Sequence, residues 1–185
     1  GDIIRDYFTN ILSQSNDPPD WRVECVDTGL ETMTGGRLLR LKEKLSDSPF
    51  MVTYGDGVGD IDMQSLIEFH RSHGKLATVT AVRPPARFGC LELDNNHVTS
   101  FAEKSPASAG WINGGFFVFE PEVLSFIKNE KTKLEAAPLV NLAEQGDLMA
   151  FKHRGYWKPM DTLREKRELE ADWRHKNAPW LSRKK

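Results

Sequence analysis

The sequence has few cysteines, no excess of positive charge and no long apolar run, and each absence excludes a class of protein. Its 185 residues include two cysteines, Cys25 and Cys90. Both lie in apolar, strand-like segments, so we expect buried thiols in a reducing compartment rather than a disulfide. The net charge of −2 argues against a nucleic-acid partner. Because no run is long enough to cross a bilayer and no signal segment is visible, we expect a cytoplasmic protein without a membrane partner.

The sequence also lacks the arrangements typical of nucleophilic hydrolases and zinc enzymes. We find no Ser-His-Asp or Cys-His arrangement. His70 and His73 have no Cys or carboxylate partner at zinc spacing, so we expect them to be structural. The segment 32–37 places two glycines before a helix, whose first N–H groups could meet a nucleotide. It has no Lys-Ser/Thr pair and is therefore not a Walker loop.

What the sequence does contain is an alternation of helical and strand-like segments. We expect helices over 2–12, 36–45, 62–73, 133–145 and 162–176, and a further helix that starts at Pro121. Asp62 is the expected N-cap of the third helix and Gly74 its expected end, and Pro138 should break the fourth helix. Trp173, in the last helix, is expected to be a packing residue. We expect strands over 22–26, 50–54, 76–82, 111–119 and 148–152, and a hairpin over 89–103 with its turn at 94–96. This order predicts one α/β domain over residues 1–185, with a mainly parallel mixed sheet covered on both faces.

The segment 50–62 combines a strand with a loop rich in Gly and Asp. The strand ends at Tyr54, and Gly55, Asp56 and Gly57 follow. In α/β folds ligands bind outside the carboxyl ends of the strands, where glycine lets the backbone approach them closely. Asp56 is therefore a candidate ligand for a divalent metal that carries phosphates. A plain turn between a strand and a helix would have the same composition.

Asp161 is a second candidate carboxylate. It ends the segment 155–161, just before the last expected helix. Mg²⁺ is usually held by one or two carboxylates, with phosphate oxygens and waters as the other ligands. Asp56 and Asp161, from two loops at one edge of the sheet, would suffice. Taken alone, the position of Asp161 favours a helix N-cap instead.

Two further segments carry groups suited to a phosphorylated sugar. Glu103 and Lys104 end a strand; the lysine could face a phosphate and the glutamate could accept hydrogen bonds from hydroxyls. A solvated charge pair is the commoner explanation for such a position. Gly114 and Gly115 interrupt an apolar strand, which indicates a bulge or the close approach of a ligand. Asn113 could hydrogen-bond that ligand.

Taken in chain order, nine short segments resemble those of the glucose-1-phosphate cytidylyltransferase family of sugar nucleotidyltransferases. They cover residues 26–29, 33–38, 54–60, 87–89, 101–104, 112–118, 145–151, 156–164 and 178–180. The resemblance implies a Rossmann-like nucleotide-diphospho-sugar transferase fold. It also implies a homo-oligomer and a Mg²⁺-dependent reaction of CTP with α-D-glucose 1-phosphate. CDP-D-glucose and pyrophosphate would form by in-line attack of the sugar phosphate on the α-phosphorus.

The resemblance assigns a role to each candidate residue. Asp56, Lys104 and Asp161 match the catalytic positions; the two aspartates match those that bind Mg²⁺, and the lysine matches the one that holds the sugar phosphate. The expected substrate-binding residues are Glu103, Asn113, Gly114, Gly89, Gly35, Gly36, Arg37, Tyr54 and Gly55. Among these, 35–37 match the nucleotide-side loop and 113–114 the sugar-facing strand. Ser105 interrupts the usual Glu-Lys-Pro segment.

One departure from the family concerns a Gly-rich loop of the form Leu-Ala-Gly-Gly-x-Gly-Thr-Arg, which follows the family's first strand. That loop is not among these 185 residues. We therefore expect an amino-terminally incomplete domain without its first strand, and no activity from this polypeptide alone. Two alternatives stay open. They are a related sugar-1-phosphate nucleotidyltransferase that uses another nucleotide, and a non-catalytic fragment of such an enzyme.

Overall fold

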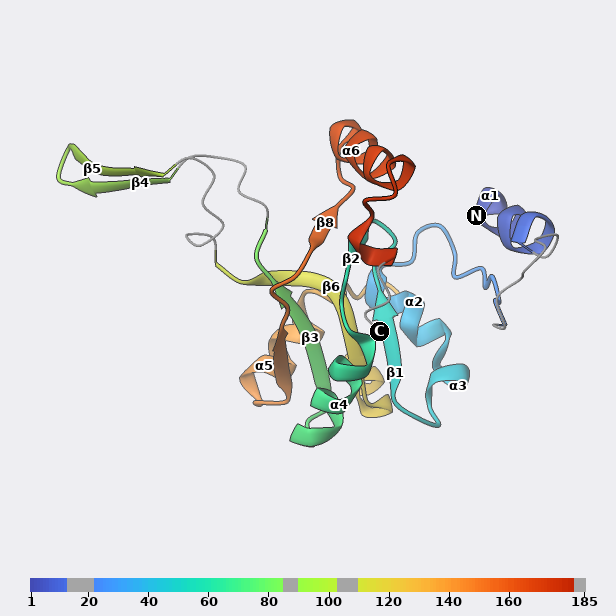
Figure 1. The fold of residues 1–185 in the computed structure, drawn as a ribbon. Coiled ribbons are helices and arrows are strands. Elements are labelled where there is room, and N and C mark those ends of the chain that lie inside the picture. Colours follow the sequence, from blue (N-terminus) through green and yellow to red (C-terminus); the bar gives the residue numbers. More distant parts are fainter. Residues whose placement is uncertain (13–21, 85–89, 103–109, 182–185) are drawn as a thin grey trace.

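The centre of the molecule is a four-stranded mixed sheet (Figure 1). The computed structural model describes residues 1–12, 22–84, 90–102 and 110–181. The strands, in spatial order, are β1 (Phe50–Thr53), β6 (Ile112–Phe119), β3 (Ala77–Val82) and β7 (Leu148–Lys152). β7 pairs parallel to β3, whereas β6 runs antiparallel to both β1 and β3. The α/β class is confirmed, but β6 makes the pairing less parallel than the alternation of elements suggested. The carboxyl ends of β1, β3 and β7 and the start of β6 meet at one edge.

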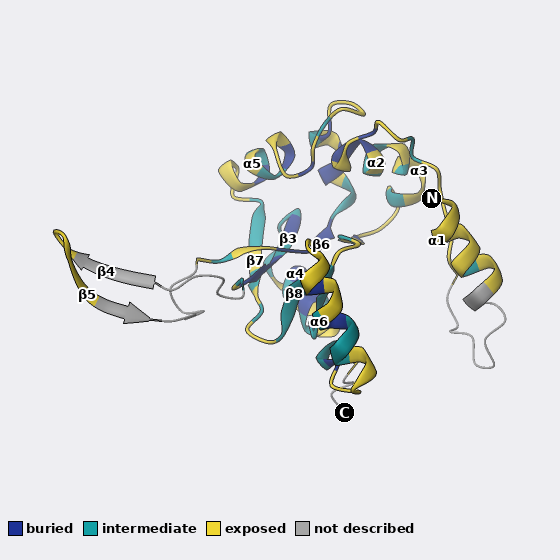
Figure 2. Cartoon of the chain, turned by 90° about the horizontal axis from the view of Figure 1, so that it is seen from above, coloured by how far each residue is buried: buried dark blue, intermediate teal, exposed yellow. Residues whose placement is uncertain are grey.

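Helices cover both faces of this sheet (Figure 2). One face carries α2 (Thr34–Arg40), α3 (Lys42–Leu45), α5 (Ala137–Glu144) and the 3-10 turn η3 (Pro121–Phe126); the other carries α4 (Met63–His73). Alternate side chains of β6 point to opposite faces, as a strand requires. Phe117 and Phe119 enter the core beneath α5 and η3, and Val118 enters a smaller core with Leu66 of α4. Burying each such side chain contributes roughly 1.5–3 kcal/mol.

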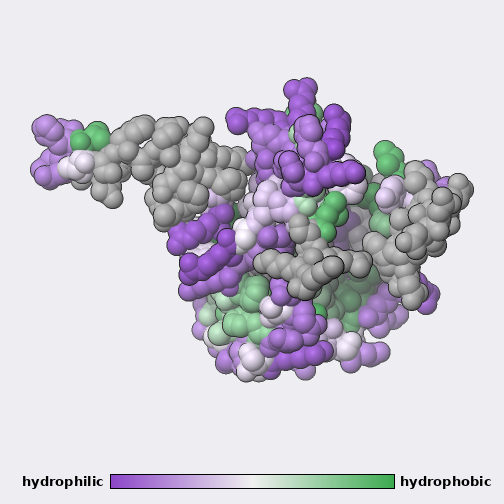
Figure 3. Space-filling view, in the orientation of Figure 1, coloured by the Kyte–Doolittle hydropathy of each residue, from purple (hydrophilic) through white to green (hydrophobic). Residues whose placement is uncertain are grey.

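Three units project from the sheet (Figure 1). The first unit consists of β2 (Gly57–Gly59), β8 (Trp157–Pro159), α6 (Leu163–Arg174) and η4 (Pro179–Leu181). The second is the hairpin of β4 (Cys90–Asp94) and β5 (His97–Ala102). The third is α1 (Asp2–Asp6) with η1 (Tyr7–Leu12). The β4–β5 hairpin and the α1–η1 helix stand on opposite sides of the body. α6 lies beyond the edge where β1, β3 and β7 end, and its surface is hydrophilic (Figure 3). In the part of the chain that the structure describes, no helix has the length and apolar character that a membrane span needs.

Several local predictions are confirmed. Asp62 caps α4, since its carboxylate accepts a hydrogen bond from the Ser65 N–H, and Gly74 ends the helix with φ +62°. Asn95 lies at the turn of the β4–β5 hairpin with φ +53°. At all three positions a short polar residue or glycine suits the backbone.

Other expectations about local structure are wrong. Residues 22–26 form no strand, and Cys25 is an exposed free thiol rather than a buried one; the side chain of Cys90 lies outside the described residues. The helix expected over 36–45 divides at Leu41 into α2 and α3. Pro138 lies in the first turn of α5, where its missing N–H costs nothing, so it begins the helix instead of breaking it.

Candidate functional site

A short antiparallel ladder brings the two candidate aspartates to the same place. Gly57 pairs with Pro159 in the β2–β8 ladder. The ladder continues one residue further, because the backbone N–H of Met160 donates to the carbonyl oxygen of Asp56 at 2.7 Å. Asp56, just before β2, and Asp161, just after β8, therefore lie at the same end of the ladder. We call the two chain segments that carry them the aspartate arms. Both residues are exposed. The structure brings together residues that are 105 positions apart in the chain.

Two contacts tie this pair of arms to the edge of the central sheet. The indole Nε1 of Trp157 donates to the carbonyl oxygen of Gly114 in β6 at 2.8 Å. His153, just after β7, lies with its Nε2 3.0 Å from a carboxylate oxygen of Asp60. The arms that carry the aspartates are thus held against the start of β6 and the end of β7. Trp157 lies in a segment quoted for the family resemblance, but its contact could not be read from the sequence.

The N-cap of α6 is Thr162 and not Asp161, so the expected capping role of Asp161 is wrong. The Glu165 N–H donates to the Thr162 hydroxyl at 3.2 Å, and the Thr162 N–H donates to the Glu165 carboxylate at 2.9 Å. This reciprocal pair is a capping box. Capping therefore does not explain why a carboxylate stands at position 161.

A chain of hydrogen bonds lies beside the aspartate arms. Asn113 Nδ2 donates to the Tyr54 hydroxyl at 3.1 Å, and that hydroxyl donates to Glu135 at 2.6 Å. Partial burial, followed by the bond to Glu135, raises the pKa of Tyr54 well above its ordinary value, so the phenol stays protonated at neutral pH. Two expected substrate-binding residues, Tyr54 and Asn113, are thereby in direct contact. Glu135 was not singled out from the sequence, where nothing links it to a partner 81 positions away.

The glycine pair of β6 is explained by packing as well as by a bulge. A Cβ on Gly114 would lie 2.8 Å from Val82 Cγ1. Gly115 has φ +77°, and a Cβ on it would lie 2.6 Å from Cδ2 of the Tyr54 ring. The register of β3 against β6 shifts between Val79 and Ala81, which confirms the expected bulge. The close approach of a ligand to Gly114 stays a prediction.

The first turn of α2 places Gly35 and Gly36 in the interior and Arg37 at the surface. The Gly36 N–H donates to the carbonyl oxygen of Thr132 at 3.2 Å, so this N–H is already bonded within the chain. The Arg37 guanidinium donates to the hydroxyl of Thr28 at 2.6 Å. Of the three, Arg37 is the exposed residue, and its contact with a nucleotide stays a prediction.

Four predicted site residues remain, and the structure describes one of them. Gly55 is exposed, and a Cβ built on it meets nothing within 4 Å. Gly89, Glu103 and Lys104 lie outside the described residues. Their expected roles in holding the sugar and its phosphate therefore stay predictions.

The donor set at the edge suits magnesium better than a transition metal. Among the described residues, no cluster of three or more His, Cys, Asp and Glu side chains could hold a metal. Asp56 and Asp161 would offer two hard oxygen ligands from adjacent arms. Mg²⁺ is commonly bound by this number of carboxylates, with substrate phosphates and waters as its other ligands. The residues present fit such an ion.

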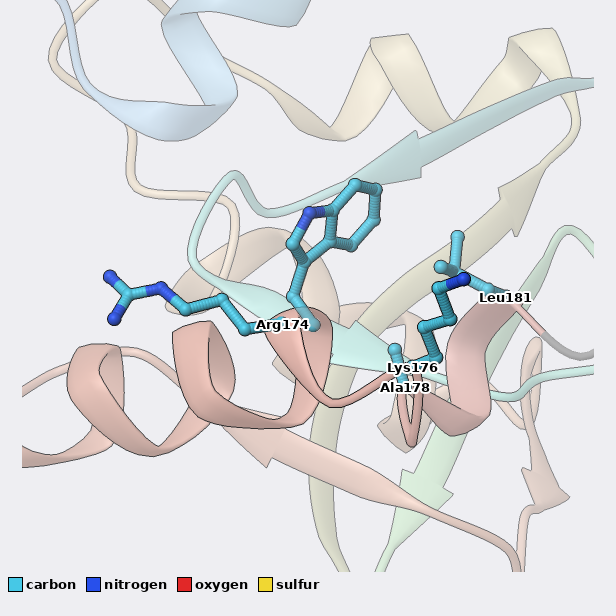
Figure 4. Close-up of a pocket in the computed structure, with 5 residues that line it drawn as sticks. Arg174, Lys176, Ala178 and Leu181 are labelled. Carbon is cyan, nitrogen blue, oxygen red and sulfur yellow. The ribbon is translucent and has the colours of Figure 1, made fainter.

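A cavity of about 600 Å³ lies at the carboxyl end of α6 (Figure 4), whereas Asp161 precedes the start of this helix. Trp173, Arg174, Lys176, Ala178 and Leu181 line it. Figure 4 shows Arg174 pointing away from Lys176 and Leu181. Since the 12 residues of α6 span about 18 Å, this cavity is not part of the aspartate site. Trp173 is 58% exposed, so the expectation that it is a packing residue is wrong.

In open α/β sheets, ligands bind outside the carboxyl ends of the parallel strands, which is the edge where the two aspartates lie. Residues 28–165 match the family model described as nucleotidyl transferase. The chain is 46% identical to the glucose-1-phosphate cytidylyltransferase of Salmonella typhi, over 97% of this chain and 77% of that protein. It is 36% identical to a probable glucose-1-phosphate cytidylyltransferase of Bacillus subtilis, over 95% and 69% respectively. The chain belongs to the nucleotidyl transferase family and, within it, to the glucose-1-phosphate cytidylyltransferases, as the sequence segments predicted.

Solved structures support the fold. HddC from Yersinia pseudotuberculosis matches with a TM-score of 0.67 at 23% identity, over 91% of this chain and 74% of that one. A putative glucose-1-phosphate thymidylyltransferase from Bacillus anthracis matches with a TM-score of 0.59 at 18% identity, over 100% and 74%. At these identities the likeness bears on the fold alone.

Proposed function

We propose that this protein forms CDP-D-glucose and pyrophosphate from CTP and α-D-glucose 1-phosphate, with Mg²⁺ held by Asp56 and Asp161. The observation that carries the proposal is the β2–β8 ladder. It lies with both aspartates at the edge of the sheet where β6, which carries Asn113, begins. Membership of the glucose-1-phosphate cytidylyltransferases supports the choice of CTP and glucose 1-phosphate.

The chemistry of the substrates fits a site without a catalytic base. A sugar 1-phosphate is already anionic near neutral pH, so its oxygen can attack the α-phosphorus without losing a proton to the protein. When bound, Mg²⁺ would neutralise charge on the phosphate oxygens. The protein must therefore orient two anionic substrates. Asp56 and Asp161 would anchor the phosphates through the ion, Lys104 would contact the sugar phosphate, and Asn113 would hydrogen-bond the sugar.

The test is equilibrium binding of nucleotide sugars to the purified chain by isothermal titration calorimetry. CDP-glucose, UDP-glucose, dTDP-glucose and GDP-mannose are titrated with and without Mg²⁺, and CDP-glucose formation from CTP and glucose 1-phosphate is followed on the same preparation. We expect CDP-glucose to bind most tightly, and only with Mg²⁺. Product formation by the chain would also support the proposal, and would contradict the expectation that this polypeptide alone is inactive.

Two results would contradict the proposal in different ways. Preferred binding of GDP-mannose would indicate a different nucleotide and sugar; the mannose-1-phosphate guanylyltransferase catalytic subunit beta of Xenopus tropicalis is 30% identical over 80% of this chain and 44% of that protein. Failure to bind any nucleotide sugar would favour a non-catalytic binding module instead.

Assembly and location complete the proposal. We propose a homo-oligomer in the cytoplasm. The exposed Trp173 and Leu181, 58% and 55% accessible beside the cavity at the end of α6, support the assembly. Size-exclusion chromatography with light scattering tests it, and a monomer at all concentrations would contradict it.

A further inference from the structure

Glu135 is contacted by side chains from two separate parts of the site. The Thr34 hydroxyl, at the start of α2, donates to Oε2 at 2.7 Å. The Tyr54 hydroxyl, at the end of β1, donates to Oε1 at 2.6 Å. Thr34 is itself fixed, because its hydroxyl oxygen accepts the N–H of Leu134 at 2.9 Å. One carboxylate therefore joins the nucleotide-side helix to the strand that leads to Asp56.

The direction of each hydrogen bond in the series from Glu135 through Tyr54 to Asn113 follows from the charge of Glu135. An ionised carboxylate can only accept, so the Tyr54 proton must point toward it. The phenol oxygen is then left to accept a proton from Asn113 Nδ2 at 3.1 Å. At its other end Asn113 accepts the Gly115 N–H through Oδ1 at 2.8 Å. The amide of Asn113 is thus fixed from both ends, and one N–H of Nδ2 remains to donate to a ligand.

We propose that Glu135 is a positioning residue that orients Asn113 toward the sugar, through Tyr54, and couples that orientation to α2 on the nucleotide side. The inference rests on the proposed function, which supplies the sugar and the nucleotide. Glu135 itself need not touch either substrate. Glu135 acts by accepting hydrogen bonds from the Tyr54 hydroxyl and the Thr34 hydroxyl at the same time.

The protonation states support this arrangement near neutral pH. Partial burial would raise the pKa of Glu135. The hydrogen bonds from Tyr54 and Thr34, with smaller contributions from a backbone hydrogen bond and the charge of Lys133, outweigh it and lower that pKa below its ordinary value. The carboxylate therefore stays ionised and accepting, and Tyr54 stays protonated and donating. A glutamine has one acceptor oxygen instead of two, so it cannot accept from both hydroxyls in this geometry.

The first experiment reads the orientation of Asn113 in the ligand-free protein. The side-chain amide resonances of Asn113 are assigned by their loss in Asn113→Ala and are compared in Glu135→Gln and in Glu130→Gln. Glu130 is a matched control, because its carboxylate pairs with Arg40 of α2 at 2.8 Å instead of accepting from Tyr54 and Thr34. We expect the Asn113 signals to shift and exchange faster with water in Glu135→Gln and to stay unchanged in Glu130→Gln. Equal signals in both variants would overturn the proposal.

The second experiment measures coupling in the binding of CDP-glucose with Mg²⁺. We expect Glu135→Gln to weaken binding about tenfold, as loss of one charge-assisted hydrogen bond does. Adding Glu135→Gln to Asn113→Ala should weaken it little further, since residues that act through one another are not additive. Independent, multiplicative effects would overturn the proposal. If the parent chain bound no nucleotide sugar, the proposed function would fail, and the resonances of Asn113 would still decide the orienting role of Glu135.

Discussion

Replacing Gly36 by alanine tests how tightly α2 is packed against the segment that precedes α5. A Cβ at position 36 would lie 2.6 Å from both the carbonyl carbon and the Cα of Glu130, and closer still to its carbonyl oxygen. All three are backbone atoms, which cannot turn aside as a flexible side chain can. The same carbonyl oxygen accepts the Met33 N–H at 2.9 Å. The new methyl group must therefore displace the 129–132 segment and disturb this hydrogen bond.

The magnitude follows from three opposing effects. Overpacking costs about 1–3 kcal/mol or more, a disturbed hydrogen bond costs about 1 kcal/mol, and alanine gains about 1 kcal/mol over glycine in helix propensity. We therefore expect Gly36→Ala to lower the free energy of unfolding by about 1–3 kcal/mol. For a chain of this size that corresponds to a fall in melting temperature of about 2–12 °C.

The assay is equilibrium urea unfolding followed by tryptophan fluorescence, with a thermal melt by circular dichroism. Gly55→Ala is the matched control, because a Cβ there meets nothing within 4 Å. The control should stay within about 1 kcal/mol of the parent. If Gly36→Ala were as stable as Gly55→Ala, the packing of α2 against Glu130 would be refuted.

Three further predictions address the other parts of the molecule. The free energy of unfolding should fall as the pH drops below 6.5. Burial, then the charges of His70 and Lys75, lower the pKa of His73 in the folded protein, so the unfolded chain takes up the proton more readily than the folded one. Urea midpoints between pH 5 and 7.5 measure this. Thr162→Ala should lower the free energy of unfolding by about 1 kcal/mol through loss of the capping box, measured by urea unfolding. Trp157→Phe should weaken Mg²⁺-dependent CDP-glucose binding about fivefold, because β8 loses its hydrogen bond to β6; calorimetry measures it.

Each of these has its own control. His73→Gln should flatten the pH dependence, whereas His97→Gln on the exposed hairpin should leave it as steep as in the parent; equal slopes in all three proteins would contradict the account. Asp161→Asn should cost less stability than Thr162→Ala, since the cap is Thr162. Trp173→Phe, at an exposed indole, should bind CDP-glucose like the parent, and an equal loss in both tryptophan variants would argue against the contact of β8 with β6.

The parts of the fold that were predictable are those set by local chemistry. The N-cap at Asp62 and the left-handed Gly74 that ends α4 followed from residue types next to an apolar period, and both are present. The capping box of α6 was visible as Thr162 and Glu165 three positions apart. It was overlooked because Asp161, one position earlier, is an equally good capping residue by type.

The parts that were not predictable depend on contacts between distant residues. Segment 22–26 has a strand-like pattern but no partner strand in the described residues, so its backbone is irregular. Glu135 lies in a polar segment before α5 and gains its position from Tyr54, 81 residues away. The two aspartates were identified from the sequence, whereas the β2–β8 ladder that aligns them emerged from the structure.

The most direct test of the central claim is a calorimetric titration of CDP-glucose into the chain at increasing Mg²⁺ concentration. Asp56→Asn and Asp161→Asn are compared with the parent and with Asp47→Asn, an exposed aspartate near the opposite end of β1. We predict that both site variants lose Mg²⁺-dependent binding while Asp47→Asn retains it. Equal Mg²⁺ dependence in all four proteins would contradict the assignment of Asp56 and Asp161 as the metal site.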